Sequence, residues 1–117
     1  MQLAEMLALL TAWATEKPLV GRLWLFGSRV RGDHRSDSDV DVAIELDMSA
    51  AKGVDESGGM ATWAFDTKQW KPELEDLLSL IVDLQRYKAG ETNIIQAGLD
   101  QSSILVYEKK GKLNFLM

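Results

Sequence analysis

Residues 23–46 have the sequence LWLFGSRVRGDHRSDSDVDVAIEL, and the organisation of the chain follows from them. The apolar run Leu23–Phe26 predicts a buried strand, which ends at Gly27 and Ser28. A short segment rich in arginine comes next, and a second strand begins at Val40. The stretch therefore predicts two strands joined by a polar connection.

Apolar and acidic residues alternate along the second strand. One face carries Val40, Val42, Ile44 and Leu46, and the other carries Asp39, Asp41, Ala43, Glu45 and Asp47. Such alternation is typical of a half-buried strand, and it places Asp39 and Asp41 on the same face with Cα atoms about 6.5 Å apart. Two carboxylates this close repel each other unless a proton or a cation lies between them. Because carboxylate oxygens are the ligands of hard divalent cations, the pair predicts a metal site.

The Gly27-Ser28 turn has the features of a phosphate-binding site. We expect one helical turn after it, with Ser28 as the N-cap and Gly32 as the C-terminal stop. A glycine lets a phosphate approach the backbone, and free amides at a helix start attract anions. The Ser28 hydroxyl and the Arg29 guanidinium add donors suited to phosphate oxygens. With the acidic strand, this turn provides what nucleotidyl transfer requires.

Gly27, Ser28, Asp39 and Asp41 match the signature GSx10DxD, and on these residues the chain resembles the DNA polymerase β-type nucleotidyltransferase superfamily. The segments GSRVRG and SDVDVAI are similar to its minimal, single-domain members, the MNT proteins. The resemblance extends from about Leu19 to Glu108 and is strongest over the signature. It implies an α+β fold, a small mixed sheet flanked by helices that is similar to the catalytic palm of the superfamily.

The resemblance also implies roles for individual residues. Asp39 and Asp41 would bind Mg²⁺, with two ions expected at the site. Members of the superfamily carry a third carboxylate on a later strand, and Asp83 is in the position that resembles it. Together these three aspartates would be the catalytic and metal-binding residues. The nucleotide would be held by four others: Gly27, Ser28, Arg29 and Ser38.

Asp83 is also unusual in its own right, because it lies in the apolar run 80–87, which predicts a strand. A buried carboxylate without a partner is unfavourable, so Asp83 should contact a metal or an arginine. Glu75 and Asp76 compete weakly for the role, since both lie on a helical stretch with ordinary surface chemistry.

Three other interpretations of the segment from Gly27 to Asp41 compete with a nucleotidyltransferase site. An EF-hand loop would need glycine at Val42 and glutamate at Met48, and has neither. A P-loop would need Gly-Lys-Ser/Thr after Gly27, which is absent from the sequence. A solvated acidic face on an edge strand remains an alternative.

Length and composition limit the class of protein. At 117 residues, with 46% apolar and 26% charged residues, the chain fits one globular domain, 1–117. It contains no cysteine, and we expect a cytoplasmic protein without a signal peptide or a membrane span. The net charge of −5 argues against an extended nucleic acid as partner. The local excess of Arg22, Arg29, Arg31 and Arg35 suits a nucleoside triphosphate instead.

The remaining segments are predicted from periodicity and turn residues. Residues 2–16 and 93–101 predict helices, 103–108 predict a strand, and 61–79 look helical, with the effect of Pro72 left open. The glycine-rich loop 48–60 is either a flap beside the metal site or a plain connector. His34 fits a solvated loop better than a phosphate contact, and the role of the tail 109–117 stays open.

The function that follows is transfer of a nucleoside monophosphate, AMP from ATP or another NTP, to an acceptor hydroxyl. Minimal members typically act with a separate HEPN-domain protein, so the resemblance implies an antitoxin that adenylylates, and oligomerises with, a HEPN toxin. An antitoxin that acts by contact alone is an alternative. An aminoglycoside-type nucleotidyltransferase is another, although no substrate domain is visible in the sequence.

Overall fold

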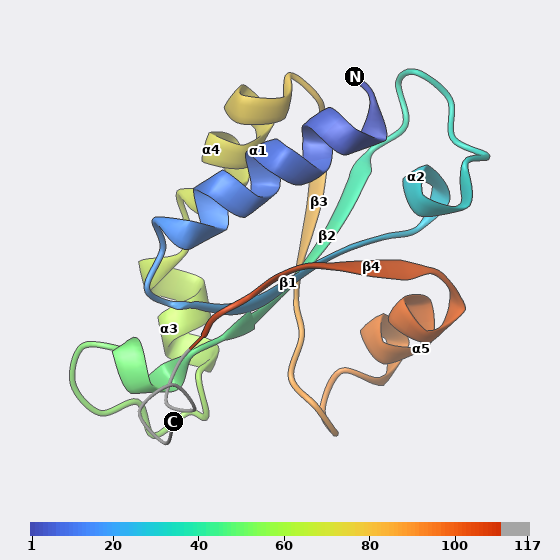
Figure 1. Cartoon of the computed structure of the whole chain (residues 1–117). Coiled ribbons are helices and arrows are strands. Elements are labelled where there is room, and N and C mark those ends of the chain that lie inside the picture. Colours follow the sequence, from blue (N-terminus) through green and yellow to red (C-terminus); the bar gives the residue numbers. More distant parts are fainter. Residues whose placement is uncertain (111–117) are drawn as a thin grey trace.

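The computed structural model describes residues 1–110, in which four strands form one sheet with helices on both sides (Figure 1). The strands are β1 (Val20–Phe26), β2 (Val40–Leu46), β3 (Val82–Arg86) and β4 (Ser103–Glu108). The helices are α1 (Leu3–Thr15), α2 (Ser28–Arg31), the 3-10 helix η1 (Met48–Ala50), α3 (Met60–Asp66), α4 (Trp70–Leu78) and α5 (Asn93–Gln101).

The strands lie in the order β3-β2-β1-β4. β1 is antiparallel to both β2 and β4, whereas β3 is parallel to β2. A parallel neighbour requires a long crossover, and the chain makes it through η1, α3 and α4. The predicted α+β class, with a small mixed sheet flanked by helices, is confirmed.

α1 and α4 cover one face of the sheet (Figure 1). Their inward side chains pack on the apolar face of β2 and on the inward residues of β1 and β3. The buried cluster consists of Met6, Leu10, Ala14, Val20, Leu23, Leu25, Val40, Val42, Ile44, Trp70, Leu74, Leu78 and Val82. Trp13 and Trp63 meet Trp70 edge to face, with ring centroids 5.4 and 6.1 Å from its own. Trp70 is thus part of the core, and Trp13 and Trp63 pack against it.

α5 lies on the opposite face of the sheet, against β1 and β4 (Figure 1). On that face the rings of Trp24 and Tyr87 meet with centroids 5.0 Å apart, and the Tyr87 hydroxyl donates to Gln96 of α5 at 2.5 Å. On the face that carries the aspartates of β2, α5 therefore packs near β1 and β4.

The stretch 61–79 forms two helices, and the break is not at the proline. α3 ends at Asp66 and α4 begins at Trp70, so Pro72 is the third residue of α4. In the first turn a backbone N–H has no acceptor within the helix, and proline there removes no helical hydrogen bond. The helices at 3–15 and 93–101 and the strand at 103–108 are found as predicted, whereas the strand in 80–87 is limited to Val82–Arg86.

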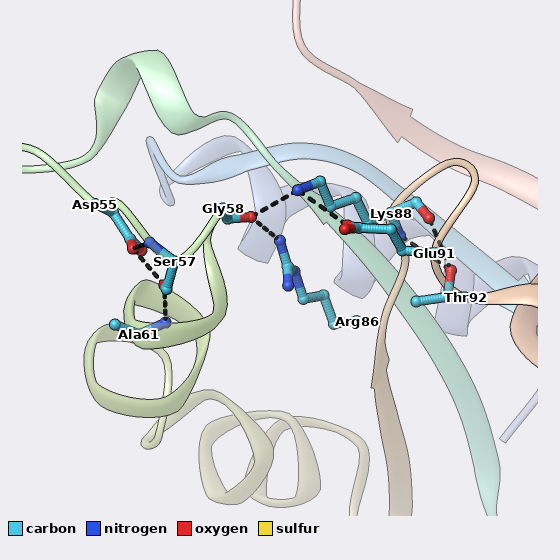
Figure 2. A network of polar contacts seen from close by, with 8 residues as sticks. All are labelled: Asp55, Ser57, Gly58, Ala61, Arg86, Lys88, Glu91 and Thr92. Atoms are coloured by element: carbon cyan, nitrogen blue, oxygen red, sulfur yellow. Dashed lines mark hydrogen bonds and ion pairs between the residues drawn. The ribbon is translucent and has the colours of Figure 1, made fainter.

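The loop between η1 and α3 is attached to the end of β3. The Gly58 carbonyl accepts hydrogen bonds from Arg86 Nη2 at 2.5 Å and from Lys88 Nζ at 2.9 Å (Figure 2). Within the same loop the Asp55 carboxylate accepts from the backbone and side chain of Thr62 in α3. Arg86 pairs with Ile44, three register positions from Asp83, so the loop lies at the far end of β3 from the aspartates. It is a connector, and the interpretation as a flap beside the metal site is wrong.

At the C-terminus, Lys109 continues from β4 and bonds to Asp47 and to the Pro18 carbonyl. The rest of the predicted tail, 111–117, lies outside the described residues. Within residues 1–110, no helix has both the length and the apolar character needed to cross a membrane.

Candidate functional site

Asp41 occupies the point where three strands meet. In the sheet its Cα is paired with Phe26 of β1 on one side and with Asp83 of β3 on the other. Residues paired across neighbouring strands point to the same face, and so do residues two apart along one strand. Asp39, Asp41 and Asp83 therefore lie on one face at one end of the sheet, as required for a shared site.

Asp41 interacts unfavourably with the other two carboxylates. Burial raises the pKa of Asp41, and the negative charges of Asp83 and then Asp39 raise it further, while Arg31 opposes the shift. A carboxylate that is both partly buried and beside two like charges favours a proton or a cation. A cation held by oxygen ligands would relieve this repulsion.

Asp83 is exposed, and the expectation that it is buried is wrong. One side of Val82–Arg86 packs on α4, whereas the side that carries Asp83 is open because α5 lies against β1 and β4, away from β3. Its partner is Gln85, whose Nε2 donates to Asp83 Oδ1 at 2.7 Å, and no arginine of the described residues forms a salt bridge with it. Glu75 instead bonds to Lys71 and to the amide of Val82, which is a structural role.

The side chains of Asp39, Asp41 and Asp83 are of the type that binds a hard divalent cation. Three carboxylates supply oxygen ligands, and the raised pKa of Asp41 reflects a repulsion that a cation would relieve. In their present rotamers, however, no three acidic or histidine groups within residues 1–110 surround a single point. Asp83 would have to exchange its bond to Gln85 for the ion, which an exposed side chain can do.

Gly27 lies against the acidic group. Its backbone has φ 80° and ψ −152°, a region that only glycine adopts readily, and a Cβ at this position would overlap Oδ2 of Asp41. The Gly27 amide donates to the Ser102 carbonyl at 3.3 Å, which connects the turn to the residue between α5 and β4. The glycine is needed because the turn approaches the carboxylate so closely.

The helical turn after Gly27 differs from the prediction at its start. Gly27 is the N-cap and Ser28 the first helical residue, without a capping hydrogen bond from a side chain, so the assignment of Ser28 as N-cap is wrong. The Ser28 hydroxyl is therefore not used as a cap. At the other end, Gly32 is left-handed with φ 84° and ends the helix as predicted.

Arg29 is the buried residue of α2, with 6% of its surface exposed. Its guanidinium donates to the Ser38 carbonyl from Nη2 at 2.8 Å and from Nε at 3.3 Å, and Nη2 also lies 3.3 Å from the Ser36 carbonyl. The Ser38 hydroxyl accepts from the Arg35 amide at 2.8 Å. Arg29 and Ser38, both predicted to contact the nucleotide, are thus engaged with the loop that joins the two halves of the motif.

The other arginines of the predicted basic group are not all close to the aspartates. Arg22 pairs with Glu45 in the sheet, four residues along β1 from Phe26, and its side chain bonds to Glu108 at 2.6 Å. Arg31 is the one whose charge lowers the pKa of Asp41. It also donates to Ser102 Oγ at 3.4 Å.

Arg35 and His34 are exposed in the loop, as predicted for His34. Arg31 was expected only as one of four local arginines, and two neighbours of the motif, Gln85 and Ser102, were not anticipated from the sequence. Their contacts with the motif depend on strand pairing and on the return of the chain after α5, for which the sequence carries no local signal.

Comparison with known proteins identifies one family. The sequence model described as "Nucleotidyltransferase domain" matches residues 8–110, which include every residue of the site. No curated protein sequence matches the chain significantly.

Several solved structures share the fold. One is described as a toxin–antitoxin with AMP-PNP (20% identity, 93% of this chain and 73% of that chain, TM-score 0.54). Another is a mutant of the toxin–antitoxin MntA-HpeT (20% identity, 92% and 73%, TM-score 0.56). A third is a tri-AMPylated Shewanella oneidensis HEPN toxin in complex with MNT antitoxin (19% identity, 98% and 79%, TM-score 0.54). At these identities the likeness is one of fold, and it agrees with the resemblance to MNT proteins found in the sequence.

Proposed function

Because the chain belongs to the nucleotidyltransferase domain family, we propose that it transfers AMP from ATP to a hydroxyl group of a partner protein. The observation that carries the proposal is the pairing of Asp41 with Asp83 in the sheet, beside the Gly27 turn. This arrangement provides an acidic site next to a turn from which donors can reach a phosphate chain.

Each residue has a role that follows from its chemistry. Asp39, Asp41 and Asp83 would hold Mg²⁺, in one or two ions, through their carboxylate oxygens. When bound, the metal supplies positive charge that neutralises the triphosphate and stabilises the transition state. Gly27 lets the nucleotide approach the backbone, and the Ser28 hydroxyl is a donor for phosphate oxygens. Arg31, whose charge already acts on Asp41, adds a cation at the same end of the sheet.

The reaction is an in-line substitution at the α-phosphorus. The acceptor oxygen forms a bond to that phosphorus, the bond from the α-phosphorus to the bridging oxygen of the β-phosphate breaks, and pyrophosphate leaves with the electron pair. The proton of the acceptor hydroxyl must be removed as its oxygen attacks. Asp83, which is exposed like Asp39, would either join Asp39 and Asp41 in holding the metal or take this proton as the general base.

The acceptor we propose is a HEPN-domain toxin, with this chain as its antitoxin in a shared complex. Two considerations support it: the similarity of the signature segments to MNT proteins, and the likeness of fold to chains of toxin–antitoxin complexes, one of which contains an AMPylated HEPN toxin. The chain itself adds a third, since a net charge of −5 suits a protein acceptor better than a nucleic acid.

The test is incubation of the protein with ATP, Mg²⁺ and a HEPN partner, followed by intact mass measurement of the partner. The wild type should add one or more adenylyl groups. Asp39→Asn with Asp41→Asn should fold normally and add none, because neutral amides hold Mg²⁺ poorly and the loss of several kcal/mol of charge stabilisation slows transfer by at least about 100-fold.

The alternative is an antitoxin that acts by contact alone. Its protective surface need not include the carboxylates, so the double variant would protect against the toxin as well as the wild type does. Full protection by the double variant, with no mass change of the partner under either protein, would overturn the catalytic proposal.

A further inference from the structure

The motif separates its two functional halves by ten residues, and the structure shows how that segment is held. After α2 and Gly32 the chain forms an irregular loop over residues 33–39. A turn at the end of this loop is closed twice: the Ser38 amide donates to the Arg35 carbonyl at 3.1 Å, and the Arg35 amide donates to Ser38 Oγ at 2.8 Å. The turn immediately precedes Asp39, so its position sets where the acidic strand begins.

Arg29 is the side chain that fastens this turn to α2. Two of its nitrogens, Nη2 and Nε, donate to the single carbonyl of Ser38, and Nη2 also reaches the carbonyl of Ser36. With these bonds and those of the turn, the amide, hydroxyl and carbonyl of Ser38 are all engaged. A planar guanidinium that donates from two nitrogens to one oxygen fixes direction as well as distance.

The surroundings of Arg29 fit this role better than that of a phosphate ligand. Only 6% of its surface is exposed, and within residues 1–110 it forms no salt bridge. Its partners are main-chain carbonyls, which carry no net charge and cannot move independently of the loop. Arg31, two residues later on the same helical turn, is exposed and is the arginine that influences Asp41.

We propose that Arg29 is a positioning residue: it couples the Gly27-Ser28 turn to Asp39 by clamping the carbonyl of Ser38, and so sets the spacing between the phosphate end and the acidic end of the site. The functional part of this proposal rests on the proposed nucleotidyl transfer, whereas the clamp itself is independent of it. Loss of the clamp should loosen residues 35–39 and move the Asp39 carboxylate, with little effect on the contacts that hold the phosphates.

The experiment compares Arg29→Lys with the wild type and with Arg22→Lys. Lysine keeps the positive charge but has one nitrogen at its end, so it cannot reproduce the two-nitrogen fork. Arg22→Lys makes the same chemical change at an arginine that bonds to Glu108, away from the aspartates.

Amide hydrogen exchange is measured first, on the protein without metal or nucleotide. In Arg29→Lys the amides of residues 35–40 should exchange at least about tenfold faster, and in Arg22→Lys they should not change. Titration with Mn²⁺ should then give at least about tenfold weaker binding for Arg29→Lys alone. In the transfer assay this variant should lower kcat at a fixed, subsaturating Mg²⁺ concentration and leave KM for ATP unchanged.

A phosphate ligand would give the opposite pattern, with normal exchange in residues 35–40 and a raised KM for ATP, and that result would overturn the proposal. If Arg29→Lys does not fold, the wild type still decides: the Nε–H resonance of Arg29 should be protected from exchange and unmoved by ATP with Mg²⁺, whereas fast exchange or a large shift on adding ATP contradicts the clamp. If the wild type transfers no AMP while exchange and Mn²⁺ binding respond as expected, the proposed function fails and the clamp stands.

Discussion

Two aspartates at opposite ends of β2 have opposite environments. Asp41, near the start of the strand, has a raised pKa because it is partly buried and lies beside Asp83 and Asp39. Asp47, directly after the end of the strand, has a lowered pKa, first because Lys109 donates a hydrogen bond to it and then because Ser49 does. The ionised form of aspartate is thus disfavoured at the start of β2, at Asp41, and favoured just after its end, at Asp47.

The difference extends to the rest of the two ends. At the Asp47 end, opposite charges are paired: Lys109 with Asp47 at 2.6 Å, Arg22 with Glu108 at 2.6 Å, and Lys88 with Glu91 at 2.9 Å. At the Asp41 end, like charges gather beside a glycine with an unusual backbone conformation. Perturbed carboxylates concentrate at functional sites, so the repulsion around Asp41 is consistent with the proposed site at this end of the sheet.

Among substitutions at the two ends of β2, Gly27→Ala should cause the largest loss of stability. The new Cβ would overlap Asp41 Oδ2 in a backbone region that alanine avoids, so we expect a loss of about 3 kcal/mol or more in the free energy of unfolding, together with loss of transfer activity. Urea unfolding measures the first. The matched control is Gly32→Ala. Gly32 also has a positive φ, but nothing lies within 4 Å of a Cβ added there, so this variant should lose only about 1–2 kcal/mol in the free energy of unfolding. Equal losses for the two variants would mean that the contact with Asp41 is unimportant.

Asp47→Asn should have a smaller effect, confined to stability. It weakens the bond to Lys109, and since that pair is partly exposed we expect a loss of about 1 kcal/mol at pH 7. Glu56→Gln removes the same charge at an exposed residue and should be neutral.

The loss in Asp47→Asn should also depend on pH. Because the folded protein lowers the pKa of Asp47, the pair stabilises the fold above the usual pKa of aspartate, near 4, and this contribution disappears as pH falls through the lower folded pKa. Thermal unfolding of the wild type and the variant should therefore converge below about pH 4. A difference that stays constant to pH 2 would show that the charge of Asp47 is not its source.

The smallest effect, and the one with opposite sign, is expected for Asp41→Asn. Without metal, an amide relieves the repulsion from Asp83 and Asp39, and the variant should be more stable than the wild type by about 0.5 kcal/mol after allowance for solvent screening. Mg²⁺ at ten times its dissociation constant should stabilise the wild type by about 1.4 kcal/mol and the variant by much less. Calorimetric unfolding with EDTA and with Mg²⁺ measures both. A variant that is less stable than the wild type in EDTA would mean that the charge of Asp41 does not destabilise the fold.

The sequence by itself determined most of the local structure and the chemistry of the motif. Alternation of apolar and acidic residues defined β2 and the common face of Asp39 and Asp41, because side chains repeat every two residues along a strand. Gly32 was identifiable as a helix stop since few other residues adopt a positive φ. The signature was recognisable because its spacing and its residue types are local properties of the chain.

What only the tertiary structure decided is how segments distant along the chain meet. Strand pairing brought Asp83 beside Asp41. Asp83 turned out to be exposed, because periodicity predicts a strand without showing which of its faces a helix covers. Arg29 resembled a phosphate ligand in the sequence, but the return of the loop gave its guanidinium the carbonyls of Ser36 and Ser38. The glycine-rich loop 48–60 belongs to the other end of β3, because Arg86 and Lys88 bind Gly58 there. A residue type limits which partners a side chain can bind, and the fold decides which of them it reaches.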